Sequence, residues 1–120
     1  MRFMILMKSD ETAEAGVRRD EHVIGAMVKY NEALVKAGVL LAAEGLQPSS
    51  KGARVTFAGG RIRVTDGPFG EAKELVAGFW VFQVKSKEEA IEWVRRIPNP
   101  GGGTMEIEIR QVFDGTEFML

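Results

Sequence analysis

The stretch LVAGFWVFQVK, from Leu75 to Lys85, decides the fold. Its apolar residues occupy consecutive positions instead of alternating, which is typical of a strand that is covered on both faces. A second run of this kind, RFMILMK, extends from Arg2 to Lys8. We therefore predict that these two segments form the central strands of one sheet.

The segments between and after these strands supply two helices and two further strands. Apolar residues at helical spacing predict an amphipathic helix from about Asp20 to Ala37, followed by a strand over Val39–Leu46. A capping-box pattern at Ser86–Glu89 predicts the start of a second helix. The alternating pattern of Met105–Val112 predicts a strand with one wet face. The polar segment Ser9–Arg19 is predicted to be a loop that acts as a lid or rim.

The segment ARVTFAGGRIRVT, from Ala53 to Thr65, predicts a β-hairpin. Gly59 and Gly60 form its two-residue turn. Pairing outward from the turn places Phe57 opposite Ile62 on an apolar face, whereas arginines occupy the other face. The pattern therefore predicts a half-buried hairpin.

The order of elements is β-α-β, hairpin, β-α-β, within a single domain over residues 1–120. It predicts an α+β domain of ferredoxin-like topology with both helices on one face of an antiparallel sheet. The other face needs a cover, and a second copy packed sheet to sheet is the simplest one. We expect the apolar tail, residues 113–120, to dock on that partner.

Composition excludes several classes of function. A net charge of −1 gives no field that favours nucleic acid, and no apolar run is long enough to span a membrane. With no cysteine and one histidine, a zinc site is not expected, and we predict no metal and no cofactor. Because no targeting segment is evident, a cytoplasmic protein is the default expectation.

Asp66 and His22 are the candidate catalytic residues. Asp66 precedes Gly67-Pro68 in TDGPF, so its carboxylate either stabilises a turn or acts as a base whose pKa is raised beside Phe69. His22 lies in the first turn of the first predicted helix, where a helix N-terminus favours a neutral imidazole. The alternative for His22 is a solvated surface position.

Phe69 and four further residues are candidates for substrate binding. Glu44 interrupts an apolar run, so its carboxylate must be paired or reach a wet cavity. Gln47 lies close by and cannot transfer protons. Lys73 either binds an anionic substrate or is solvated beside acidic neighbours. Trp80 belongs to the core or forms the wall of an apolar pocket.

Five segments carry a family resemblance: EGLQPSSKGARV, TDGPF, KEL, SKEEAIEWVRRIPNP and EIEIRQV. With them, the chain resembles the YCII-related, or DGPF-domain, family over nearly its whole length. This resemblance implies a bacterial protein of the dimeric α+β barrel type, in which two sheets face each other. Some relatives resemble small enzymes that act on ring-cleavage products, with a His and an Asp proposed as acid–base partners. Many DGPF proteins are encoded beside extracytoplasmic-function sigma factors, which implies a regulatory link.

Together these observations predict a homodimer that binds a small anionic or carbonyl ligand. As an enzyme it would perform cofactor-independent acid–base chemistry, of isomerase or lyase type, on a small carbonyl acid. The first alternative is a non-catalytic regulatory or ligand-sensing module associated with a sigma factor. The second is a structural dimer without a ligand. The predicted catalytic residues are Asp66 and His22, and the predicted substrate-binding residues are Glu44, Gln47, Phe69, Lys73 and Trp80.

Overall fold

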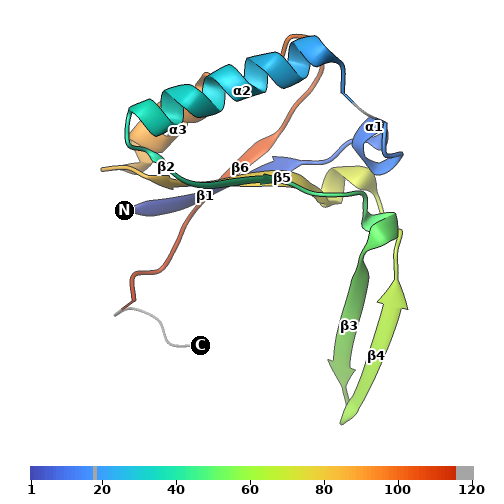
Figure 1. The fold of residues 1–120 in the computed structure, drawn as a ribbon. Helices are drawn as coiled ribbons and strands as arrows, with labels where there is room; N and C mark the ends of the chain where they lie inside the picture. Colours follow the sequence, from blue (N-terminus) through green and yellow to red (C-terminus); the bar gives the residue numbers. More distant parts are fainter. Residues whose placement is uncertain (18, 116–120) are drawn as a thin grey trace.

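The computed structural model describes residues 1–17 and 19–115. A four-stranded antiparallel sheet carries two helices on one face, and a separate two-stranded hairpin projects from the other side (Figure 1). The strand order β2-β5-β1-β6 is that of a ferredoxin-like α+β fold. The elements are β1 (Arg2–Lys8), α1 (Glu11–Glu14), α2 (Glu21–Lys36), β2 (Leu40–Gly45), η1 (Ser49–Lys51), β3 (Ala53–Ala58), β4 (Arg61–Asp66), η2 (Ala72–Glu74), β5 (Val76–Gln83), α3 (Lys87–Arg95) and β6 (Ile107–Gln111).

The two strands predicted to be central, β1 and β5, pair with each other in the middle of the sheet. Their helix-facing side chains form the sheet side of the core. Ile5 and Phe82 are fully buried there, together with Leu34 of α2. The core therefore lies between the helices and one face of the sheet.

The two long helices begin where the sequence predicts. Asp20 caps α2 by accepting a hydrogen bond from the Val23 amide at 2.9 Å, and Ser86 caps α3 through the Glu89 amide at 3.1 Å. In the described part of the chain, no helix is long and apolar enough to cross a membrane.

The prediction of a loop over Ser9–Arg19 is wrong for Glu11–Glu14, because these residues form the one-turn helix α1. The Asp10 side chain caps this turn by accepting a hydrogen bond from the Ala13 amide at 2.7 Å. An aspartate before a short polar segment is an N-cap signal. Because α1 has no apolar stripe, the hydrophobic periodicity of the sequence did not indicate this helix.

The hairpin has the predicted register but not the predicted burial. Phe57 lies opposite Ile62 across the Gly59-Gly60 turn, and both glycines have positive φ, as such turns require. However, Phe57 is 75% exposed and Ile62 is 66% exposed, because the hairpin extends away from the sheet on the side opposite the helices (Figure 1). The radius of gyration, 16.3 Å, exceeds the roughly 14 Å of a compact chain of this length.

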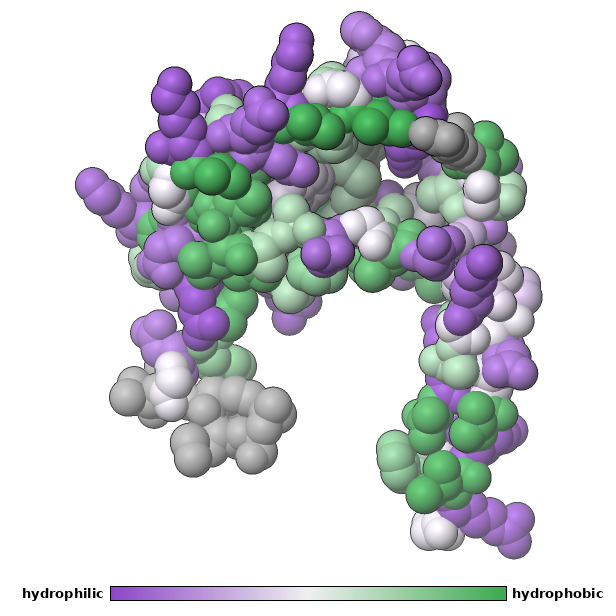
Figure 2. All heavy atoms as spheres, viewed as in Figure 1, coloured by the Kyte–Doolittle hydropathy of each residue, from purple (hydrophilic) through white to green (hydrophobic). Residues whose placement is uncertain are grey.

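Among the described residues, 1–17 and 19–115, none forms a layer over the second face of the sheet. Met4, Leu6, Phe79 and Val81 alternate with core residues in register and so point to this face. Figure 2 shows the open space below the sheet, with the hairpin on one side of it. The predicted docking of the tail concerns residues 113–120, of which 116–120 lie outside the described residues.

Candidate ligand-binding cavity

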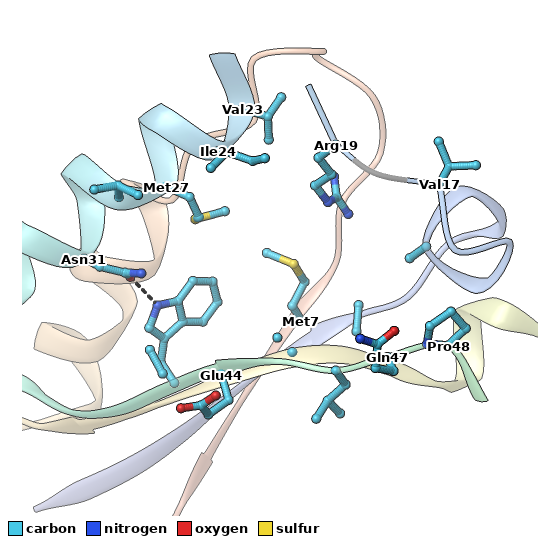
Figure 3. Close-up of a pocket in the computed structure, with 18 of the residues that line it drawn as sticks. Met7, Val17, Arg19, Val23, Ile24, Met27, Asn31, Glu44, Gln47 and Pro48 are labelled. Atoms are coloured by element: carbon cyan, nitrogen blue, oxygen red, sulfur yellow. Dashed lines mark hydrogen bonds between the residues drawn. The ribbon is translucent and has the colours of Figure 1, made fainter. Parts of the chain in front are cut away.

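A cavity of about 540 Å³ lies between α2 and the sheet, at the end nearest to α1 (Figure 3). Val23, Ile24 and Met27 of α2 form its upper wall. Met7 of β1 and Trp80 of β5 face them from the sheet. The wall is mostly apolar, as is usual for sites that hold small molecules.

The cavity exists because the side-chain layer of the sheet is missing at this point. Gly45 of β2 pairs with Gly78 of β5, on the same face as the neighbouring Ala43–Trp80 pair. A Cβ atom at Gly78 would lie only 3.0 Å from the Glu44 carbonyl oxygen. Glycine inside a strand often marks the close approach of a ligand or another backbone. Each glycine lies within a predicted strand, but the sequence alone does not show that the two glycines pair.

Trp80 lies in the cavity wall in a fixed orientation. Its indole Nε1 donates a hydrogen bond to Oδ1 of Asn31 at 2.8 Å (Figure 3). The ring of Tyr30 packs edge-on against it, with ring centroids 5.9 Å apart. Because both contacts hold the indole, the wall is rigid where a ligand would pack against it.

A second, more polar cavity of about 760 Å³ adjoins the first. It lies between α1, η2 and the segment that leads from α3 to β6. The two cavities share part of their walls, and Arg19 is the charged residue in the shared part. The second cavity also has Asp10 and Lys73 in its lining.

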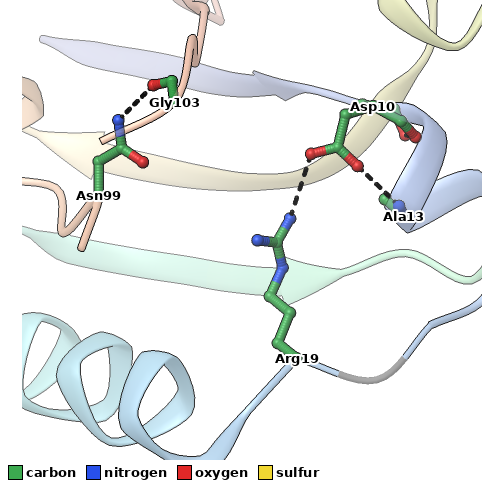
Figure 4. A network of polar contacts seen from close by, with 6 residues as sticks. Asp10, Ala13, Arg19, Asn99 and Gly103 are labelled. Carbon is green, nitrogen blue, oxygen red and sulfur yellow. Dashed lines mark hydrogen bonds and ion pairs between the residues drawn. The ribbon is translucent and has the colours of Figure 1, made fainter. Parts of the chain in front are cut away.

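Arg19 forms an ion pair with Asp10, with 4.0 Å between Nη2 and Oδ2 (Figure 4). Both side chains are about half exposed, so water weakens this attraction and the guanidinium keeps donors for a ligand. In the same region, Asn99 Nδ2 donates to the Gly103 carbonyl at 2.8 Å and shapes the glycine-rich segment. Within residues 1–17 and 19–115, no three His, Asp or Glu side chains are placed to share a metal ion.

Four of the predicted site residues lie in the walls of these cavities. Trp80 and Gln47 line the first cavity and Lys73 lines the second. Glu44 contributes to the wall of the first cavity, but its carboxylate points to the opposite side of the sheet (Figure 3). This carboxylate is exposed on the open face, so it needs no partner in the cavity.

The other three predicted residues lie elsewhere. Asp66 and His22 are exposed, and neither is among the residues that line these two cavities. Phe69 is half-buried outside both linings, with the Arg54 guanidinium 4.2 Å above the centre of its ring. The cavity therefore gives no support to the catalytic roles predicted for Asp66 and His22. Reasoning from the sequence did not select Asp10 and Arg19, because they lie in a segment that was predicted to be a loop.

The TDGPF stretch anchors the base of the hairpin. The Phe69 amide donates to Oγ of Ser49 at 3.1 Å, and the Gly67 amide donates to the Gly52 carbonyl at 3.0 Å. Ser49 in turn donates to Glu14 of α1, through its hydroxyl and through its amide at 2.9 Å. These two hydrogen bonds lower the pKa of Glu14 below its ordinary value of 4.5. These contacts tie down the backbone of Gly67 and Phe69 and do not involve the Asp66 carboxylate, so both roles predicted for that carboxylate stay predictions.

Comparisons with known proteins agree with this architecture. An uncharacterised protein of Rhizobium meliloti (strain 1021) is 30% identical over 112 residues, which span 92% of this chain and 90% of the relative. The solved structure of 5-chloro-2-hydroxyhydroquinone dehydrochlorinase (TftG) from Burkholderia phenoliruptrix AC1100, in complex with 2,5-dihydroxybenzoquinone, has a similar fold. It matches with a TM-score of 0.55 and 14% identity over 98% of both chains. The family model of the YCII-related domain matches residues 1–114. The chain therefore belongs to the YCII family.

Proposed function

We propose that this protein binds a small, mostly apolar molecule that carries an anionic or enolic oxygen, with the apolar part in the first cavity. The observation that carries the proposal is the position of Arg19. It is a charged donor at the junction of an apolar and a polar cavity. A guanidinium at such a junction orients an anionic oxygen, while the apolar wall selects the rest of the molecule.

The size of the cavity limits the ligand. An apolar cavity of about 150 Å³ is enough for benzene, so about 540 Å³ accommodates one ring with substituents or a short branched carbonyl acid. The flat floor at Gly45 and Gly78 suits a planar molecule. The fold neighbour TftG, whose structure contains 2,5-dihydroxybenzoquinone, supports this size class by analogy alone.

The reaction that suits these groups is proton transfer next to a carbonyl group. Asp10 takes the proton from carbon, the electron pair moves onto the carbonyl oxygen, and the Arg19 guanidinium stabilises the resulting enolate. Return of the proton to another atom completes an isomerisation, and departure of a β-substituent completes an elimination. In this proposal Asp10 takes the role that the sequence analysis gave to Asp66.

The experiment is a binding titration by calorimetry, with 2,5-dihydroxybenzoquinone and benzoate as probes. We expect Arg19→Gln to weaken binding at least tenfold, which corresponds to the loss of one charged hydrogen bond of about 1.4 kcal/mol or more. The matched control is Arg95→Gln, because Arg95 of α3 lies in neither lining and has only an exposed ion pair. Equal binding by wild type and Arg19→Gln would contradict the proposed anchor.

The catalytic part of the proposal has its own pair of variants. Asp10→Asn removes the base but keeps an oxygen that can cap α1, because asparagine is as good an N-cap as aspartate. Asp20→Asn makes the same change at the cap of α2, outside both linings. We expect Asp10→Asn to abolish proton exchange of a bound carbonyl acid in D₂O, followed by NMR, and Asp20→Asn to leave it unchanged. Ligand binding without exchange in wild type would favour the ligand-sensing alternative.

We also propose that two copies assemble through the open face of the sheet. Leu6 and Phe79 lie opposite each other on that face, and their apolar surface gains from burial. A charged row at one side, formed by Lys8, Glu108 and Arg110, would form the polar rim. Native mass spectrometry tests the assembly, and a monomer at micromolar concentration would contradict it.

A further inference from the structure

The hairpin carries an apolar face that is left exposed by the part of the chain that the structure describes. Val55, Phe57, Ile62 and Val64 form two facing pairs across β3 and β4, and each is more than half exposed. Figure 2 shows these green side chains gathered on the projecting arm, remote from the core. A contiguous exposed apolar patch of this kind marks an interaction site.

The open sheet face alone is small for a stable dimer. Its four strands contain five to eight residues each, so at standard strand spacing they present a flat footprint of roughly 400 Å². A stable interface buries about 800 Å² on each partner. Contoured side chains bury more accessible surface than a flat footprint measures, so the sheet face supplies part of this area. The hairpin projects from the same side of the sheet and would add to it (Figure 1).

The length of the hairpin determines what it reaches on a second copy. Each of its strands has 6 residues and is therefore about 20 Å long. Two sheets packed face to face lie about 10 Å apart. The hairpin therefore extends past the partner's sheet to the level of the partner's helices, and Phe57 and Ile62 lie in its outer half, next to the turn.

The helix layer offers an apolar groove at that level. Val28 and Val35 line a shallow groove on the outer surface of α2, and both are at least half exposed. Leu41, on the edge strand β2, is also more than half exposed. Val35 and Leu41 lie outside the linings of both cavities, whereas Val28 also borders the first cavity.

We propose that the β3–β4 hairpin of each copy is an arm that docks on a second copy, with Phe57 and Ile62 against the α2 groove at Val28 and Val35. The arrangement satisfies two-fold symmetry, because each copy supplies one arm and one groove. The proposal rests on the proposed homodimer but goes beyond it, since a dimer held by the sheets alone would leave the arms in solvent.

The experiment places the photocrosslinker p-benzoyl-phenylalanine at position 57 of the full chain. We expect a covalent dimer after irradiation, and mass spectrometry of the digested product should join the hairpin to a peptide containing Val28 or Val35. The matched control has the crosslinker at Thr56, the adjacent position on the opposite face of the hairpin, where the dimer yield should be at least fivefold lower.

A second measurement separates the arm from the dimer itself. The double variant Phe57→Ser with Ile62→Ser should raise the dimer dissociation constant at least tenfold, with an unchanged far-UV circular dichroism spectrum. The matched change Thr56→Ser with Arg63→Ser on the other face should leave it within twofold. If wild type is dimeric but neither the crosslink nor the weakening appears, the arm proposal is wrong and the sheet-to-sheet dimer stands. If wild type is monomeric, both are wrong.

Discussion

Gly67→Ala tests the interpretation of TDGPF as a packed turn. A Cβ atom at position 67 would lie 1.8 Å from the Ser49 carbonyl oxygen, far below the 3.0 Å that real Cβ atoms respect. Relief requires the two segments to separate by more than about 1 Å, which breaks the hydrogen bonds from Gly67 to Gly52 (3.0 Å) and from Phe69 to Ser49 (3.1 Å). At about 1 kcal/mol for each of the two hydrogen bonds and about 1–3 kcal/mol for the strain, we expect the free energy of unfolding to fall by about 3–5 kcal/mol.

The assay is urea unfolding followed by circular dichroism, together with thermal unfolding, where this loss corresponds to a fall of roughly 12–20 °C in Tm. The matched control is Gly52→Ala on the facing segment. Its Cβ would lie 3.5 Å from the same Ser49 oxygen and its φ is −109°, so we expect a change within about 0.5 kcal/mol. Equal stabilities for the two variants would refute the packed-turn argument.

Three further predictions concern the cavity and its rim. Gly45→Leu places a side chain in the cavity floor, where nothing lies within 4 Å of the new Cβ. Calorimetry should show at least tenfold weaker probe binding at an unchanged Tm, and unchanged affinity would place the ligand elsewhere. Asn31→Leu leaves the Trp80 indole N–H unpaired, so the free energy of unfolding should fall by about 1–3 kcal/mol in urea titrations, whereas no loss would mean that water replaces the amide. The hydrogen bonds from Ser49 lower the pKa of Glu14. Their contribution to stability is therefore present above the unfolded-state pKa and is lost as the pH falls through the folded-state pKa. Glu14→Gln should flatten the decrease of Tm below about pH 5, and a parallel decrease in both proteins would argue against this.

The sequence predicted the fold well because buried positions recur along strands and helices as a regular pattern of apolar residues. The consecutive apolar runs identified β1 and β5 as central strands, and the Gly59-Gly60 turn fixed the register of the hairpin. Burial of the hairpin was predicted wrongly for a physical reason. An apolar face records that something covers it, but not whether the cover belongs to the same chain.

The candidate site was harder to predict, since a cavity is made by absent side chains. Gly45 and Gly78 are unremarkable in sequence and become informative only when strand pairing places them side by side. The charged pair at the mouth, Asp10 and Arg19, lies in a polar segment without periodicity. Asp66 was predicted as a catalytic residue because it belongs to the distinctive TDGPF motif. In the structure, the closely packed residue of this motif is Gly67, whose backbone contacts the segment at Ser49 and Gly52.

The hairpin and the cavity share one segment of chain, which couples the two proposals. Pro48 lines the first cavity, and the next residue, Ser49, holds both Glu14 of α1 and the amide of Phe69. Displacement of this segment by Gly67→Ala should therefore weaken probe binding as well as stability, although Gly67 itself lines neither cavity. Calorimetry at 15 °C, where the variant remains folded, separates the two effects. Wild-type affinity in a destabilised variant would mean that the cavity rim and the base of the hairpin move independently.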